Sequence, residues 1–172
     1  MKALGVTGWS GAGKTTLLTK LIPLLTGRGL RVSTIKHAHH SFDVDKPGKD
    51  SYLHRDAGAT EVLIGSAERW ALMHEIREDD EPGLEQLMAM MTPVDLVLVE
   101  GYKFEGHNKI EVHRKGLGKP LLCREDRSFI ALAANYRPDD VDLPVLDLDD
   151  VEGVADFVMN YCRSSKPEEL AS

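Results

Sequence analysis

Residues 8–15 constrain the fold of this chain more than any other stretch of its sequence. They read Gly-Trp-Ser-Gly-Ala-Gly-Lys-Thr and match the P-loop pattern G-x-x-x-x-G-K-[ST] at every fixed position. A short apolar run at 3–7 precedes the loop, and residues 16–22 are typical of the opening of a helix. Since a strand, a glycine-rich loop and a helix in this order form a phosphate site, the sequence predicts an α/β nucleotide-binding fold.

The loop contains the chemical groups that bind a nucleoside triphosphate. Its glycines allow successive backbone N–H groups to point at one anion, and the N-terminus of the following helix adds partial positive charge. Lys14 is expected to reach the β- and γ-phosphates, and the Thr15 hydroxyl is expected to ligate Mg²⁺. The residues predicted to bind the nucleotide in this stretch are Gly8, Ser10, Gly11, Ala12, Gly13, Lys14, Thr15 and Thr16.

Composition limits the size of the fold and the kind of partner. The 172 residues, 42% of them apolar, suffice for one α/β domain, expected over 1–163, with a flexible polar tail at 164–172. A net charge of −7 without a basic stripe argues against a nucleic-acid partner. The two cysteines lie far apart, which is typical of a reducing compartment. Because no signal peptide precedes the first strand and no apolar run approaches the ~20 residues of a membrane span, we expect a cytoplasmic protein with no membrane partner.

Apolar patterns predict a mostly parallel P-loop NTPase sheet flanked by helices, with a small β-hairpin insertion. Continuous apolar runs, as at 2–7 and 95–99, are typical of strands buried on both faces. Residues 61–66 and 70–74 alternate on either side of a short turn, which predicts the hairpin. The other expected strands are 31–36, 109–114, 120–123, 129–133 and 145–146, and the expected helices are 14–28, 50–57, 83–91 and 150–161. Ligands of such sheets bind at the carboxyl ends of the strands.

Glu100 follows the apolar strand at 95–99 and precedes a glycine. A carboxylate at the end of a strand beside the P-loop is the position of the Walker-B acid, so we predict that Glu100 holds Mg²⁺ with Thr15. The alternative is a solvated glutamate at a strand end. Among the basic residues that could meet an anion, Lys49 and Lys103 lie closest in sequence to the acidic candidates, and we predict that they contact the nucleotide.

Residues 36–45 concentrate ionisable groups, including three histidines among four residues at 37–40. One interpretation is a switch-like loop over the γ-phosphate, with Asp45 or Asp50 near the metal-bound water. A second is a transition-metal site, because imidazole is a frequent ligand. A third is a polar loop with no ligand. On the first interpretation, the catalytic candidates of the chain are Lys14, Glu100 and Asp45.

The residue that reads the nucleotide base is harder to predict. Residues 108–111 read Asn-Lys-Ile-Glu and nearly match the guanine-reading signature N-K-x-D. That signature should follow a strand, whereas here it precedes one and would lie at the wrong edge of the sheet. Asn135, just after the strand that ends near residue 133, is better placed to contact the base.

Several motifs together resemble the molybdopterin-guanine dinucleotide biosynthesis protein B (MobB) family. They are Trp9-Ser10-Gly11-Ala12-Gly13-Lys14-Thr15-Thr16, Ile35-Lys36-His37-Ala38-His39-His40, Asp45-Lys46-Pro47-Gly48-Lys49-Asp50-Ser51, Ala57-Gly58-Ala59 and Val99-Glu100-Gly101-Tyr102-Lys103. The P-loop is common to many families, but the second and third blocks in this order are far more specific. The resemblance extends over nearly the whole chain.

This resemblance implies a function that the spacings alone do not show. Such proteins are homodimeric, bind GTP with Mg²⁺ and hydrolyse it slowly. They act beside the guanylyltransferase that joins GMP to molybdopterin, as adapters that bind GTP or the pterin. Two other classes remain open from the residues. A small-molecule kinase or ATP-dependent ligase would need an arginine-bearing lid, whereas the candidate region at 69–82 is mostly acidic. A metal-delivery GTPase would be expected to add a cysteine motif or a long histidine tract.

Overall fold

The computed structural model describes residues 1–38, 42–78 and 80–164. The chain groups into two compact units, one formed by Met1–His37 with the chain from Met91 onward, the other by Ala38–Met90. The single domain expected over 1–163 stays a prediction. Of the tail expected at 164–172, Ser164 is the last residue of the final helix, and the rest lies outside the described residues.

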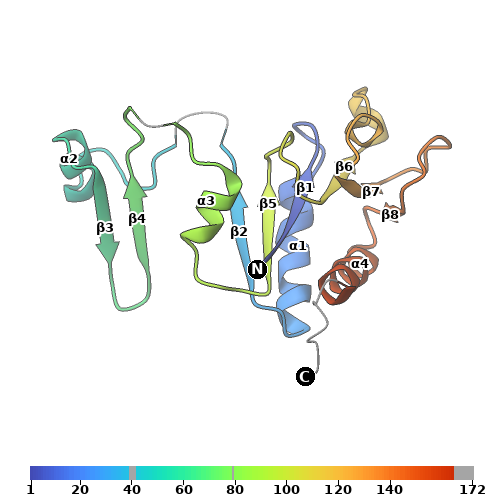
Figure 1. Cartoon of the computed structure of the whole chain (residues 1–172), viewed down its shortest axis with the longest axis horizontal. Coiled ribbons are helices and arrows are strands. Elements are labelled where there is room, and N and C mark those ends of the chain that lie inside the picture. Colours follow the sequence, from blue (N-terminus) through green and yellow to red (C-terminus); the bar gives the residue numbers. More distant parts are fainter. Residues whose placement is uncertain (39–41, 79, 165–172) are drawn as a thin grey trace, which may run out of the picture. The chain divides into compact units, whose positions relative to one another are not determined.

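The first unit is built on a parallel six-stranded sheet with the order β2-β5-β1-β6-β7-β8 (Figure 1). The interior strands β1 and β5 are mostly buried, as their apolar runs predict, and β6 is buried at every position. The mostly parallel P-loop sheet is therefore confirmed. The strands are β1 (Lys2–Thr7), β2 (Val32–Lys36), β5 (Leu96–Glu100), β6 (Lys109–His113), β7 (Phe129–Ala134) and β8 (Val145–Asp147).

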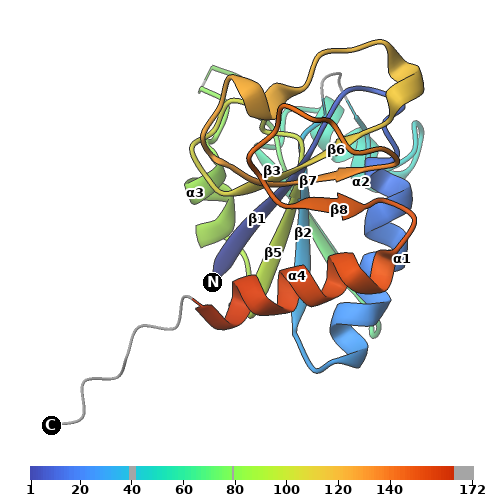
Figure 2. The same ribbon diagram turned by 90° about the vertical axis from the view of Figure 1, so that its right-hand side faces the viewer.

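Two long helices, α1 (Lys14–Gly27) and α4 (Val151–Ser164), flank this sheet and lie side by side (Figure 2). Their apolar faces enter one core with the strands, because Leu21 of α1 and Val154 of α4 are fully buried in the same cluster. Asp150 accepts a hydrogen bond from the backbone N–H of Gly153 at 3.0 Å, which caps the start of α4. On the outer surface, Arg28 forms ion pairs with Glu152 and Asp156.

The strand expected at 120–123 does not form, and that prediction was wrong. Leu121 is extended, and a 3₁₀ turn, η2 (Leu122–Arg124), follows it. The cause lies in the neighbouring strand: the carboxylate of Glu111, fully buried on β6, accepts the backbone N–H groups of Leu122 and Cys123, both at 2.9 Å. These donors are satisfied locally and do not join a strand ladder. A second 3₁₀ turn, η1 (Lys115–Leu117), follows β6.

The second unit contains α2 (Asp50–Asp56), an antiparallel hairpin of β3 (Glu61–Gly65) and β4 (Trp70–His74), and α3 (Leu84–Ala89). The predicted hairpin is confirmed, with Leu63 opposite Leu72. Gly58, with φ of +108°, follows α2, in keeping with the predicted end of that helix. Across both units, no helix in the described part of the chain is long and apolar enough to span a bilayer.

Candidate functional site

The P-loop connects β1 to α1 at the carboxyl edge of the sheet. Gly11 and Gly13 have φ angles of +80° and +99°, which L-residues rarely adopt. Gly8 lies against β6, where a Cβ would collide with the carbonyl oxygen of Val112. Ala12 is fully buried in the core, so the loop is anchored to it. The glycines are thus required by the curvature of the loop and by its packing on β6.

Lys14 lies over the loop that precedes it. Its Nζ donates hydrogen bonds to the carbonyl oxygens of Gly8 and Trp9, both at 3.1 Å. Burial lowers the pKa of this ammonium below its ordinary value; Glu100 opposes that shift, while Lys103 and Lys36 add to it. Two further cations lie near the loop, since Nζ of Lys103 lies over the ring of Trp9 and Nζ of Lys36 lies close to the carboxylate of Glu100. An anion bound among them would be stabilised by their combined charge.

Thr15 and Glu100 converge beside the loop, as predicted for a Mg²⁺ site. The register of β1 with β5 places Val6 opposite Glu100, so the carboxylate lies at the strand end next to the P-loop. The Thr15 hydroxyl donates to Oε1 of Glu100 at 3.0 Å, and Nζ of Lys36 lies 3.8 Å from Oε2. A hydroxyl and a carboxylate are hard oxygen ligands of the kind that Mg²⁺ selects, so this donor set fits the ion.

The backbone after Glu100 turns sharply. Gly101 has a φ of +105°, and Tyr102 follows with a φ of +47°, the one positive value among non-glycine residues in the part of the chain that the structure describes. Left-handed backbone at a non-glycine residue is uncommon in proteins as a whole, and the residues that adopt it cluster at functional sites. The Thr7 hydroxyl, fully buried, donates to the carbonyl oxygen of Gly101 at 3.1 Å and holds this turn beside the start of the P-loop.

Trp9 joins the P-loop to the segment after β6, an arrangement that the sequence did not reveal. Its indole Nε1 donates to the carbonyl oxygen of Pro120 at 2.8 Å. The ammonium of Lys103 lies 4.8 Å from the centre of the indole ring, and that of Lys119 lies 5.5 Å from it. The predicted nucleotide contact Lys103 is thus placed beside the loop, and Lys119 is a further cation there.

Asn135 directly follows β7, at the same edge of the sheet. Its Oδ1 accepts the backbone N–H of Lys115 at 3.1 Å, so it is tied to the turn η1. The competing signature at 108–111 is located at the opposite edge, as expected, because Asn108 directly precedes β6. Lys109 of that signature is fully buried and pairs with Asp126 at 3.1 Å.

Asp45 and Lys49 belong to the second unit. The Asp45 carboxylate, only 2% exposed, receives two hydrogen bonds from Arg55, from Nε at 3.1 Å and from Nη2 at 2.8 Å. This pairing lowers the pKa of Asp45 and raises that of Arg55. Lys49 precedes α2, and its carbonyl oxygen accepts the N–H of Leu53. The described contacts of the Asp45 carboxylate are mainly those of an ion pair with Arg55 in the same unit.

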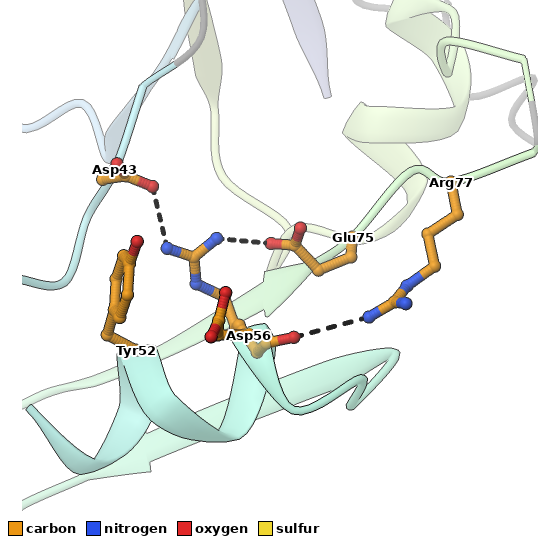
Figure 3. Close-up of a pocket in the computed structure, with 6 residues that line it drawn as sticks. Asp43, Tyr52, Asp56, Glu75 and Arg77 are labelled. Carbon is orange, nitrogen blue, oxygen red and sulfur yellow. Dashed lines mark hydrogen bonds and ion pairs between the residues drawn. The ribbon is translucent and has the colours of Figure 1, made fainter. Parts of the chain in front are cut away.

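Arg55 is the centre of a polar cluster in this unit. Figure 3 shows Asp43, Tyr52 and Glu75 among the side chains that line a pocket there. Arg55 also donates to Asp43 and Glu75, each at 2.8 Å. The pocket has a volume of about 370 Å³ and is lined by Asp43, Tyr52, Arg55, Asp56, Glu75 and Arg77. The lining is mostly charged, unlike the apolar pockets that bind most small molecules.

The histidine loop is only partly described. His37 lies against the turn after Glu100, with its ring centre 4.7 Å from that of Tyr102. His39 and His40 lie outside the described residues. Within 1–38, 42–78 and 80–164, no group of three or more His, Cys, Asp and Glu side chains could hold a metal ion.

The family model of molybdopterin guanine dinucleotide synthesis protein B (MobB) matches residues 3–135. The chain belongs to the MobB family. It is 49% identical over 163 residues to the molybdopterin-guanine dinucleotide biosynthesis adapter protein of Escherichia coli (strain K12), covering 93% of each chain. It is 46% identical to the protein of the same description from Haemophilus influenzae, covering 92% of this chain and 88% of that one.

Solved MobB structures have the same fold. A crystal structure of molybdopterin-guanine biosynthesis protein B superposes with a TM-score of 0.74 at 28% identity, over 92% of this chain and 99% of the other. The MobB homologue from Bacillus stearothermophilus superposes with a TM-score of 0.73 at 27% identity, over 95% and 99%. The resemblance drawn from the sequence motifs is confirmed.

One part of this MobB site was missed from the sequence. Arg114, Leu117 and Lys119 lie around the P-loop, although they are about a hundred residues further along the chain. Residues 115–120 follow the strand predicted at 109–114 in a sheet predicted to be mostly parallel, and the carboxyl ends of parallel strands share an edge. That rule could have drawn attention to this segment, but not to the side chains that reach the loop.

Proposed function

We propose that this protein is a GTP-binding adapter in the formation of molybdopterin guanine dinucleotide. The observation that carries the proposal is the convergence of Lys14, Thr15 and Glu100 at the P-loop of a MobB-family chain. Support also comes from the two bacterial relatives, which are described as adapter proteins of this biosynthesis. An adapter binds nucleotide without needing fast turnover, so we propose at most slow GTP hydrolysis.

Each residue at the P-loop has a role in this proposal. The backbone N–H groups of residues 8–16 surround the phosphates, and Lys14 leaves its loop carbonyls to contact the β- and γ-phosphates. Thr15 and Glu100 would hold Mg²⁺, which would neutralise charge on those phosphates. Lys103 contacts the phosphates from beside Trp9.

Three further assignments complete the proposed site. Asn135 contacts the guanine base, supported by its place at the carboxyl end of β7. Asp45 would position the metal-bound water and Lys49 would contact the nucleotide, and their place in one short segment with the MobB-like motif Asp-Lys-Pro-Gly-Lys-Asp-Ser supports both assignments. For Asp45 to position a water, the ion pair with Arg55 would have to open.

We further propose that the protein is a cytoplasmic homodimer that binds molybdopterin or its guanine dinucleotide and acts with the guanylyltransferase. The homodimer is supported by one face of the hairpin, where Leu63, Trp70 and Leu72 are 63%, 67% and 48% exposed. The pairs Leu63–Leu72 and Gly65–Trp70 place all three on that face. Exposed apolar patches of this kind mark interaction surfaces.

Calorimetry of GTP and ATP binding with Mg²⁺, on the wild type and on Lys14→Ala, tests the proposed function. We expect GTP to bind at least tenfold more tightly than ATP, a difference of about 1.4 kcal/mol. Lys14→Ala should abolish binding, because the principal cation at the phosphates is lost. Equal or tighter binding of ATP would favour the kinase or ligase class instead, and binding of neither nucleotide would contradict a P-loop site that functions without a partner.

A further inference from the structure

Arg114 lies against the P-loop, and its guanidinium has no partner among the residues that the structure describes. It directly follows β6, is half-buried, and precedes the turn η1. Its Nε and Nη2 atoms lie 3.4 and 3.6 Å from the position that a Cβ would take on Gly13. The guanidinium therefore lies beside the glycine that precedes Lys14, in space that is open because this residue has no side chain.

The surroundings of Arg114 differ from those of the arginines that form short ion pairs. Arg28, Arg55 and Arg124 each pair with at least one carboxylate at 2.8 Å or less. The guanidinium of Arg114, in contrast, makes no hydrogen bond or ion pair with any residue that the structure describes. A half-buried guanidinium loses part of its favourable hydration free energy, and hydrogen bonds to a bound anion would offset that loss.

The position of Arg114 is set by the sheet. β6 pairs with β1 in parallel, with Thr7 opposite Glu111, which brings the end of β6 beside the start of the P-loop. The segment after Arg114 is held in two places, by the hydrogen bond of Lys115 to Asn135 and by that of Trp9 to Pro120. The backbone that carries Arg114 is thus held against the loop before any ligand binds.

We propose that Arg114 is a phosphate-binding residue, whose guanidinium donates to the phosphate chain of a nucleotide held in the P-loop. The inference rests on the proposed nucleotide site and adds a cation to it. Guanidinium groups match phosphate oxygens with two parallel hydrogen bonds, and such charge-assisted bonds are stronger than neutral ones. Arg114 would contact the phosphates from the side of Gly13, whereas Nζ of Lys14 lies at the start of the loop, near Gly8.

The test compares GDP and GTP binding to the wild type, Arg114→Gln, Arg114→Lys and Arg127→Gln, with Mg²⁺, by calorimetry. Arg127→Gln removes the same charge from an exposed arginine that precedes β7, at the other edge of the sheet. We expect Arg114→Gln to weaken both nucleotides by about tenfold to a hundredfold. Arg114→Lys should recover part of the loss, and Arg127→Gln should bind within twofold of the wild type.

A second readout separates phosphate contact from contact with the base or a structural effect. In ³¹P NMR of saturated GDP complexes, the phosphate resonances should move in Arg114→Gln and stay in place in Arg127→Gln. Binding of Arg114→Gln within twofold of the wild type would overturn the inference. So would weaker binding with unmoved phosphate resonances. If the wild type and Arg127→Gln bind neither nucleotide, the proposed function fails, and this inference fails with it.

Discussion

At the scale of single residues, His107 is the buried polar side chain in the described part of the chain that lacks hydrogen-bond partners. Both nitrogens of its ring are buried and have no hydrogen-bond partner among the described residues. The ring packs against Gly5, where a Cβ would lie 2.6 Å from Nε2. Burial, with a smaller contribution from Lys109, lowers the pKa of His107 from its ordinary 6.5 to about 4, against an opposing effect of Asp126.

This shift predicts an acid-dependent loss of stability. Between pH 6.5 and 4 the unfolded chain binds a proton at His107 that the folded chain does not bind. The free energy of unfolding therefore decreases as the pH is lowered through that window. Because the residue keeps part of its surface in water, the expected contribution is about 1–2 kcal/mol. The His107→Phe variant removes it, so chemical denaturation should show a smaller fall in stability between pH 7 and pH 4.

The control for this prediction is His54→Phe, which replaces an exposed histidine of α2. It should lose stability with falling pH as the wild type does. Parallel curves for the wild type and His107→Phe would mean that His107 takes up its proton equally in both states, contrary to the burial of its ring.

At the scale of elements, a buried carboxylate determines the conformation of a whole segment. Glu111 on β6 accepts two backbone N–H groups of η2, which leaves this segment as a turn rather than a strand. The same carboxylate lies near Cys123, whose pKa is raised to about 12 by burial first and by Glu111 second. The thiol of Cys123 is therefore protonated and unreactive near neutral pH.

Glu111→Gln should loosen this segment. Each of the two N–H groups needs an acceptor oxygen, whereas glutamine offers only one. The amide NH₂ of glutamine would face the other N–H group. We therefore expect the free energy of unfolding to fall by about 2–3 kcal/mol. Cys123 should also react faster with a thiol reagent, measured by mass spectrometry of the labelled peptide. Glu105→Gln, on an exposed loop, is the matched control. Unchanged stability in Glu111→Gln would show that the two hydrogen bonds do not hold the turn.

At the scale of the whole molecule, the exposed hairpin face predicts self-association. The Leu63→Glu/Leu72→Lys pair places charges on this face, and sedimentation should show the wild type as a dimer and the double variant as a monomer. Phe104→Glu, at a residue that is 96% exposed in the other unit, is the control and should remain dimeric. A wild type that sediments as a monomer at micromolar concentration would contradict the homodimer.

The sequence by itself determined the parts that depend on short stretches of chain. The P-loop, the strand that ends at Glu100, the hairpin and the MobB motifs are local patterns of residue type, and each was predicted from its own segment. The alternation of strands and helices along the chain also predicted that Thr15 and Glu100 lie together at the carboxyl edge of the sheet, and the two side chains do meet.

Only the tertiary structure decided how distant segments meet. The order β5-β1-β6 brings Arg114 beside Gly13 and Pro120 beside Trp9. The fold also brings the Glu111 carboxylate to backbone donors of η2. The pairing of Asp45 with Arg55 likewise depends on the fold of its unit. These contacts join residues whose side chains carry no mutual pattern in sequence, because strand order and packing select the partners of each side chain.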